Sequence, residues 1–318
     1  MAEGATMAIE DPYHEGEVRV QELAGERDIA LLNAALTEDR IVAPAFRFLS
    51  QRRFLVLGQA TPEHACEGTV VFGPEGFLGA EENGRVLTVA LGPTHARSAD
   101  PVLGALDRGR RVGALAIDLA TRRRLRINGH VRAIDADRLS IEVDESYPNC
   151  PKYIQKRVVE IEDSLAAPGE ERVSDGSHLG DEQRAIVREA DTFFVVSVNP
   201  HGNADASHRG GVPGFVRLAA DGALRIPDYA GNSMFNTLGN VAVNPRAALV
   251  FWDFERSRLL HLAGRAALEL DGHDPHGDTG GTGRHWTFHV ERWRERAVRL
   301  PFRMRLVDRS PFNPSPAR

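Results

Sequence analysis

Short runs of apolar residues, separated by residues that favour turns, make up most of this chain. The runs are rich in β-branched and aromatic residues, as at 54–57, and they are too short to form helices. The dipeptides Asn83-Gly84 and Asp221-Gly222 follow such runs, and both tolerate the positive φ of hairpin turns. This pattern predicts a mainly β, α+β chain of antiparallel strands, closed into barrels that leave few exposed sheet edges.

Several sequence landmarks occur twice, in the same order and at a nearly constant offset. The pairs are 54–57 with 193–196, 76–78 with 214–216, 112–118 with 247–253, and 123–129 with 258–264. Self-similarity over this length indicates a repeated structural unit. We therefore predict two copies of one β-rich unit, at about 45–145 and 185–270.

A few segments are predicted to be helical. Apolar residues recur every three or four positions over 21–36 and 151–165, which is the spacing of one helix face. Pro151 stands just inside the start of the second segment, where its missing N–H has no helical partner to lose. Further helices are predicted over 181–190 and from a start within 234–240.

The length of 318 residues suits two domains of about 150 residues each. The stretch 166–180 is rich in glycine, proline and acidic residues, which is typical of a linker. We therefore expect an N-terminal domain, 1–165, that holds the first barrel with its leading and trailing helices. The second barrel would occupy 181–318.

Composition excludes several classes of protein. A hydrophobic content of 42% argues against a largely disordered chain, and a net charge of -6 argues against a dedicated nucleic-acid binder. Two cysteines cannot form a disulfide framework, which favours the reducing cytoplasm. The first residues are acidic and contain no apolar run, so we expect neither a signal peptide nor a membrane helix. The histidines around 271–289 match no ligand spacing, so we expect no metal site.

The segment 207–215 combines three glycines and a proline, which a strand interior disfavours unless the backbone closely approaches a ligand. Its Arg209 has a fork of donors suited to a phosphate. The segment 226–233 then leads into the predicted helix start, whose free N–H groups favour an anion. Composition alone leaves open whether these are ligand contacts or only turns and a capped helix.

Arg122, Arg123, Arg124 and Arg126 form the one basic run of the chain. Side chains alternate between the two faces of a strand, so half of these arginines would lie in solvent and half could point into an interface. We interpret the run as a surface feature, with a phosphate or an acidic substrate as the alternative.

Taken together, these segments resemble the split-barrel flavin-binding fold of the pyridoxamine 5′-phosphate oxidase-like family. The residues that carry the resemblance are 207–211, 213–216, 226–228, 231–232, 236–240 and 244–247. The first unit resembles a diverged copy. The segments 14–17 and 149–157 are similar to motifs of the large two-barrel, flavin-nucleotide-binding branch. The similarity covers roughly 12–310.

The resemblance implies two tandem split barrels with FMN at the barrel–barrel interface, and FAD is the less favoured alternative. The implied cofactor-binding residues are Ser207, His208, Arg209, Gly210, Gly211, Pro227, Asp228, Asn232, Ser233, Asn236, Thr237, Asn240, Lys152, Tyr153 and Gln155. Arg209 would neutralise the phosphate, and Gly210 and Gly211 would let the main chain pass along the flavin ring. The family's oxidase has a basic cluster at the helix start, and this chain has no basic residue between Asn232 and Asn240.

The first unit has Glu67-Gly68-Thr69-Val70-Val71 where the second has its phosphate-binding segment, and Glu67 would repel a phosphate. We therefore predict one flavin per chain, with the first barrel as its structural partner. The resemblance implies either a homodimer or a site completed inside one chain.

The function we predict is a flavin-dependent oxidoreductase of unknown substrate, with a small-molecule substrate or an electron donor such as NADH or NADPH as its partner. His208 or Arg209 would supply positive charge near the flavin, and no residue stands out as a general acid or base. The alternative is a non-catalytic flavin or haem carrier on the same fold, with His208 or His201 as a haem ligand.

Overall fold

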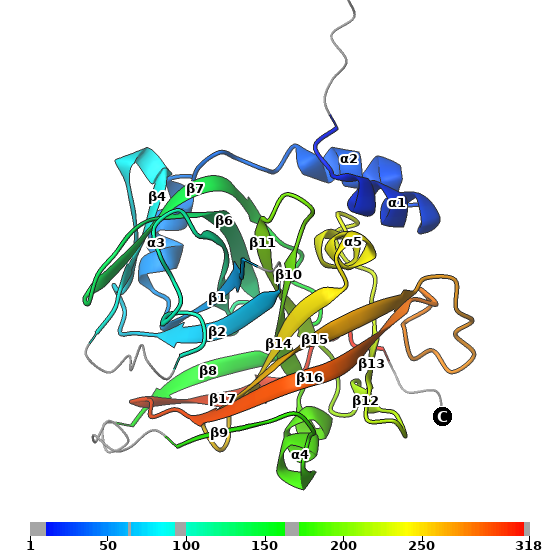
Figure 1. The fold of residues 1–318 in the computed structure, drawn as a ribbon. Helices are drawn as coiled ribbons and strands as arrows, with labels where there is room; N and C mark the ends of the chain where they lie inside the picture. The colour runs from blue at the N-terminus through cyan, green and yellow to red at the C-terminus, as the bar shows by residue number, and fades with distance from the viewer. Residues whose placement is uncertain (1–10, 63–64, 93–99, 163–171, 315–318) are drawn as a thin grey trace, which may run out of the picture.

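The computed structural model describes residues 11–62, 65–92, 100–162 and 172–314. The start of the acidic N-terminal stretch and residues 166–171 of the predicted linker lie outside these ranges. In Figure 1 two curved antiparallel sheets lie side by side, with short helices at the top and at the bottom of the view. The chain is mainly β, as predicted.

The two large sheets have the same strand order. The first runs β2-β1-β5-β6-β7-β4-β3, and the second runs β11-β10-β14-β15-β16-β13-β12. The first sheet consists of β1 (Phe54–Ala60), β2 (Cys66–Phe72), β3 (Leu78–Glu81), β4 (Val86–Ala90), β5 (Arg111–Asp118), β6 (Arg123–Ile134) and β7 (Arg138–Pro148). The second consists of β10 (Thr192–Val198), β11 (Ala204–Gly210), β12 (Arg217–Leu218), β13 (Leu224–Pro227), β14 (Arg246–Asp253), β15 (Arg258–Glu269) and β16 (His285–Ala297). The predicted repeat is confirmed, but its second copy extends past the predicted end at 270, because β16 completes the second sheet.

Strand register fixes which residues of the two copies correspond. Leu55 pairs with Ala116 and Phe193 pairs with Phe251. Ala116 and Phe251 each lie two residues before the aspartate that ends β5 or β14. Leu55 is therefore the counterpart of Phe193, and the sequence alignment of 54–57 with 193–196 was wrong by one residue. A shift of one residue along a strand exchanges its two faces, so this correction decides which side chains occupy equivalent places.

The alternation of faces divides the core into three parts. Leu55 and Leu57 point into the first barrel, and Phe193 and Val195 point into the second. The intervening residues of the same strands meet between the barrels in a shared apolar layer, which contains Phe54, Val56, Phe194, Val196 and Trp252. Phe54 packs edge-on against Trp252, with ring centroids 5.2 Å apart. The two barrels are thus held together by a buried hydrophobic interface.

Two of the helix predictions are confirmed and two need correction. α4 (Asp181–Glu189) and α5 (Asn236–Val243) form where the sequence indicates. The predicted helix over 21–36 is two helices, α1 (Glu15–Leu23) and α2 (Arg27–Ala34), because Gly25 between them has a positive φ of 67°. α3 (Pro44–Ser50) and a 3₁₀ turn, η1 (Glu82–Gly84), complete the helical elements of the described residues.

The predicted helix over 151–165 is wrong for 151–162, and its last three residues lie outside the described ranges. Residues Lys156–Ile161 form strand β8, which pairs with β17 (Phe302–Asp308). A further strand, β9 (Val173–Gly176), pairs with β16 within the segment predicted as linker. The β-branched Val158, Val159 and Ile161 suit a strand as well as a helix, and the distant β17 supplies the hydrogen bonds that decide.

α1 crosses α5 at very close range and so reaches the second barrel from the N-terminal end of the chain (Figure 1). A Cβ on Gly16 would lie 2.2 Å from the carbonyl oxygen of Gly239, and a Cβ on Gly239 would lie 2.4 Å from Glu17 Cγ. This contact brings Glu17 to the start of α5. No helix in the described part of the chain is long and apolar enough to cross a membrane.

Candidate functional site

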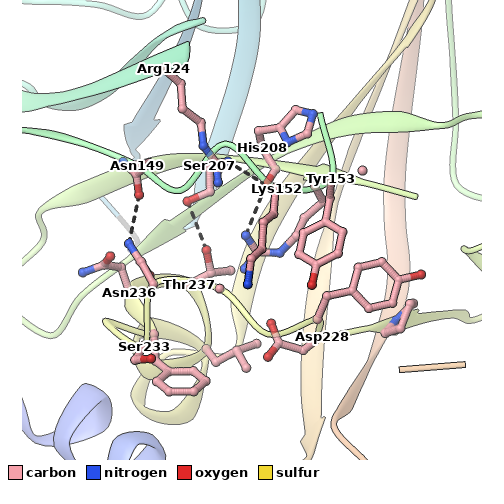
Figure 2. A pocket seen from close by; sticks show the side chains of 18 of the residues that line it. Arg124, Asn149, Lys152, Tyr153, Ser207, His208, Asp228, Ser233, Asn236 and Thr237 are labelled. Carbon is pink, nitrogen blue, oxygen red and sulfur yellow. Dashed lines mark hydrogen bonds between the residues drawn. The ribbon is translucent and has the colours of Figure 1, made fainter. Parts of the chain in front are cut away.

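A pocket of about 90 Å³ lies where β6 of the first barrel faces β11 and the start of α5 in the second (Figure 2). That volume suits a phosphate group, and the ring system of a flavin would extend beyond it. Twelve of the predicted site residues line it: Lys152, Tyr153, Ser207, His208, Arg209, Gly210, Pro227, Asp228, Asn232, Ser233, Asn236 and Thr237. The structure therefore brings most of the predicted residues together.

Three guanidinium groups converge on this pocket, from Arg124 and Arg126 on β6 and from Arg209 on β11. Arg126 donates to Asp205 Oδ1 at 2.6 Å and to the hydroxyl of Ser207. Among the described residues, Arg124 and Arg209 have no carboxylate within ion-pair distance. The pocket therefore carries more positive charge than its carboxylates balance.

The two unpaired arginines are held only by backbone carbonyls. Arg124 donates from Nε to the carbonyl of Cys150 at 2.8 Å, and Arg209 donates to the carbonyl of His208 at 3.3 Å. Within the described structure, Arg126 Nε and Arg209 Nε are buried and have no hydrogen-bond partner. Donors left in this state are costly, and an anion in the pocket would satisfy them.

Burial and mutual repulsion perturb this cluster. Burial, with the neighbouring Arg209 and Arg126, lowers the pKa of Arg124 to about 9. Burial also lowers the pKa of Arg209, and the nearby Asp228 partly offsets that effect. A guanidinium with a pKa this low is in an environment that disfavours cations, so a bound anion would stabilise the cluster.

His208 is buried beside these arginines, and its Nε2 has no partner among the described residues. Burial lowers its pKa well below the ordinary value, and the charges of Arg124, Arg209 and Arg157 lower it further. The imidazole is therefore neutral at physiological pH. Of the two residues predicted to bring positive charge, only Arg209 does so.

The polar residues around the start of α5 are largely used within the protein. Thr237 Oγ1 donates to Ser207 Oγ at 3.2 Å, which ties the helix start to β11. Three other predicted donors bind residues of the N-terminal half: Asn232 to Asn149, Ser233 to Glu26, and Asn236 to Glu17. These contacts hold the pocket wall in place, and the arginines are the groups left without polar partners.

Gly210 and Gly211 were expected to let the main chain pass along the flavin ring, but the structure gives a different reason for these glycines. A Cβ on Gly210 would lie 2.0 Å from the carbonyl oxygen of Tyr153, and a Cβ on Gly211 would lie 2.5 Å from the ring of Phe215. Protein atoms therefore occupy the space that these glycines leave. Gly211 does not line the pocket.

Gln155 and Asn240 also lie outside the pocket. Gln155 is buried and binds Asn313 and the backbone N–H of Ser310, so it anchors the C-terminal segment. Asn240 donates to Asp205 Oδ2 at 2.7 Å. Asn240 thus positions the carboxylate that pairs with Arg126, and its role is indirect.

Two tyrosines and an ion pair border the pocket. The rings of Tyr153 and Tyr229 lie 4.8 Å apart, and Tyr153 Oη donates to the carbonyl of Ala230 at 3.1 Å. Asp228 pairs with Arg284 at 3.0 Å. Tyr153 has a positive φ of 63°, which is uncommon outside glycine and often marks functional sites.

Sequence reasoning missed the contributions of Arg124 and Arg126 to the site. The signal was present, because alternate positions of a basic run on a strand share one face. Arg124 and Arg126 point into the interface, whereas Arg123 is exposed on the other side. They supply the basic groups that the sequence lacks between Asn232 and Asn240.

The second half of the chain also matches known proteins in sequence. Residues 179–276 match the family model described as pyridoxamine 5′-phosphate oxidase. A search of curated proteins finds no match.

Solved structures show partial likeness. A Clostridium acetobutylicum protein of the pyridoxinephosphate oxidase family has 15% identity and a TM-score of 0.27 over 40% of this chain and 92% of its own. A pyridoxamine 5′-phosphate oxidase-related, FMN-binding protein of Nostoc punctiforme has 18% identity and a TM-score of 0.23, over 30% and 49%. A heme-binding protein of Mycobacterium smegmatis has 17% identity and a TM-score of 0.26, over 39% and 55%.

Each of these overlays covers less than half of this chain, so the family assignment depends on the sequence match. That match spans α4, the strands from β10 to β15 and α5, which together carry Arg209 and the helix start of the pocket. The chain therefore contains, in its C-terminal half, a split barrel of the pyridoxamine 5′-phosphate oxidase-like family.

Proposed function

We propose that this protein binds FMN through its phosphate at the arginine cluster of Arg124, Arg126 and Arg209 and acts as a flavin-dependent oxidoreductase. The observation that carries the proposal is the surplus of buried guanidinium groups over carboxylates in the pocket. A phosphate dianion would supply the charge and the hydrogen-bond acceptors that the cluster lacks.

The cluster discriminates between phosphorylated and unphosphorylated ligands. With Asp205 paired to Arg126, about two positive charges remain for the phosphate, which matches the charge of a phosphomonoester near neutral pH. Riboflavin would leave the same groups unsatisfied. We therefore expect FMN to bind much more tightly than riboflavin.

The flavin would supply the hydride and electron transfer chemistry. The protein would orient it by the phosphate, and the paired rings of Tyr153 and Tyr229 would limit access of water on one side of the pocket. The neutral His208 packs edge-on against Phe194, on the face of β11 opposite Ser207 and Arg209, so we propose no contact between its imidazole and the flavin. We identify no general acid or base, so a small-molecule substrate and NADH or NADPH remain proposed partners.

One chain provides all three arginines, because β6 of the first barrel reaches the site in the second. We therefore propose a site completed inside the chain, with one FMN per chain. A homodimer is not required for binding.

The test is to purify the protein, record its absorbance and identify by mass spectrometry the molecule released on denaturation. We expect the spectrum of oxidised flavin and the mass of FMN, at one per chain. Failure to bind FMN, both as purified and after reconstitution, would refute the proposal. A Soret band would favour the haem alternative.

The redox function needs a separate test. NADH or NADPH should bleach the bound flavin under anaerobic conditions, and air should restore the colour. The alternative outcome has two parts: neither donor reduces the bound flavin, and flavin reduced by light passes no electrons to added acceptors. That outcome would identify the protein as a flavin carrier.

A further inference from the structure

The internal repeat places a second cleft opposite the arginine pocket. That pocket uses β11, β6 and the start of α5, and the corresponding elements across the repeat are β2, β15 and the turn at 100–105. These elements line a cleft of about 730 Å³. The cleft is therefore the symmetry counterpart of the proposed FMN site, and it is the larger of the two.

The corrected register shows what has changed there. Counting from Asp118 paired with Arg123, and from Asp253 paired with Arg258, Arg124 corresponds to Leu259 and Arg126 to His261. Arg209, opposite Phe193, corresponds to Val71, opposite Leu55. All three guanidinium groups of the cluster are thus absent from the second cleft.

The charges that remain around the second cleft compensate one another in three ion pairs. The pairs are Glu67 with Arg292 at 2.9 Å, Asp175 with Arg294 at 2.7 Å, and Asp100 with Arg296 at 2.6 Å. An anionic ligand would have to displace one of these carboxylates. The cleft therefore suits a ligand without net charge.

His261 lines the cleft and keeps one ring nitrogen, which is almost covered, without a hydrogen-bond partner among the described residues. It is buried, with 7% of its surface exposed, and its Nδ1 lies 2.9 Å from the carbonyl oxygen of Gly68. A carbonyl oxygen only accepts, so Nδ1 carries the proton and Nε2 has the free lone pair. Nε2 has no partner among the described residues. Burial lowers the pKa of His261 to about 4, so the ring stays neutral and accepting.

The strands beside His261 carry small side chains. Ala248 on β14 lies directly opposite Ala263 on β15, and Ala263 shares a strand face with His261. Ala248 is buried and Ala263 is half-buried, so an aromatic ring would meet the sheet at Ala263. Pro101, Ala105 and Trp293 extend the apolar lining.

We propose that this cleft is a second ligand site, which takes an uncharged, planar heteroaromatic molecule whose ring N–H or O–H donates to His261 Nε2. The ligand ring would lie against Ala263. The proposal does not depend on FMN binding at the arginine cluster, because the two clefts share no residue.

The test uses lumichrome, a neutral tricyclic compound with ring N–H donors, in equilibrium dialysis against full-length protein saturated with FMN. Saturation blocks the arginine pocket, so we expect one lumichrome per chain at the second cleft. If the protein does not take up FMN, the dialysis is run without it, and the variants below still identify the cleft.

Three variants locate the bound probe. His261→Leu should weaken lumichrome binding by about three- to tenfold, since it removes one hydrogen bond, and Ala263→Phe should abolish binding because its ring would occupy the place of the ligand beside His261. His289→Leu, at an exposed histidine on β16, is the matched control and should bind as the wild type does. Retained FMN content or an unchanged unfolding transition shows that each variant is folded.

Two results would overturn the proposed second ligand site, and a third would refute only the proposed function. No uptake of lumichrome by FMN-saturated wild-type protein would overturn the proposal. Uptake that neither His261→Leu nor Ala263→Phe reduces would also overturn it, because binding would then lie elsewhere. Loss of FMN binding with the lumichrome results intact would refute the proposed function alone.

Discussion

Replacing Arg209 with alanine isolates the contribution of the phosphate. Arg209 makes one long hydrogen bond, 3.3 Å to the carbonyl of His208, and has no carboxylate partner in the described structure. Its removal takes one favourable charge from Asp228, which keeps its ion pair with Arg284, and it relieves repulsion on Arg124, whose pKa is lowered partly by Arg209. The fold should lose little stability.

The loss in affinity can be estimated from the bonds the phosphate would make. A hydrogen bond to a charged group contributes about 1.5–3 kcal/mol, so Arg209→Ala should weaken FMN binding by about ten- to 150-fold. Riboflavin lacks the phosphate, and its weaker binding should change by less than about threefold. The test is therefore whether the substitution weakens FMN binding by a larger factor than it weakens riboflavin binding.

Isothermal titration calorimetry of FMN and of riboflavin, each with the wild type and with Arg209→Ala, measures these affinities. Arg123→Ala is the matched control, because Arg123 lies on the same strand and faces solvent instead of the pocket. An unchanged FMN affinity would remove Arg209 from the site. Equal losses for FMN and riboflavin would show that Arg209 does not bind the phosphate.

Three further predictions test the electrostatics and packing around the pocket. Burial lowers the pKa of Arg124 to about 9, so FMN affinity should fall as pH rises above that value, as calorimetry across a pH series would show; a constant affinity would show that the Arg124 guanidinium stays protonated over the whole series. Burial, followed by the charge of Asp205, raises the pKa of Glu17 from 4.5 to about 8. The contribution of Glu17 to stability is therefore complete below pH 4.5 and lost as pH rises through 8. Glu17→Gln should raise the thermal midpoint most at and above pH 8. A midpoint that the substitution does not raise there would contradict a buried, protonated Glu17. Gly210→Ala should cost about 1–3 kcal/mol in urea unfolding, because its Cβ would meet the Tyr153 carbonyl at 2.0 Å; an unaffected midpoint would show that this contact relaxes freely.

Features set by local sequence could be predicted. The alternation of apolar runs and turns predicted the repeated sheet, and the unusual glycines and polar residues after 207 predicted most of the pocket lining. The breaking of the 21–36 helix at Gly25 also has a local cause, which a closer weighting of that glycine would have found.

Features that depend on distant partners could not be predicted. Strand β8 exists because β17, about 150 residues away, pairs with it, and no local pattern distinguishes that strand from a helix. Arg124 and Arg126 line the pocket because β6 lies against β11 of the other barrel. Which face of the basic run is buried follows from pairing register, which a single sequence does not give.

The covalent link between the two barrels has a consequence for how such a protein can evolve. Were the barrels identical subunits of a symmetric dimer, every mutation in one cleft would be duplicated in the other. Joined in one polypeptide, they are encoded separately, so His261 could replace the equivalent of Arg126 without damage to the arginine cluster. A fused pair of barrels is thus free to specialise its two clefts for different molecules.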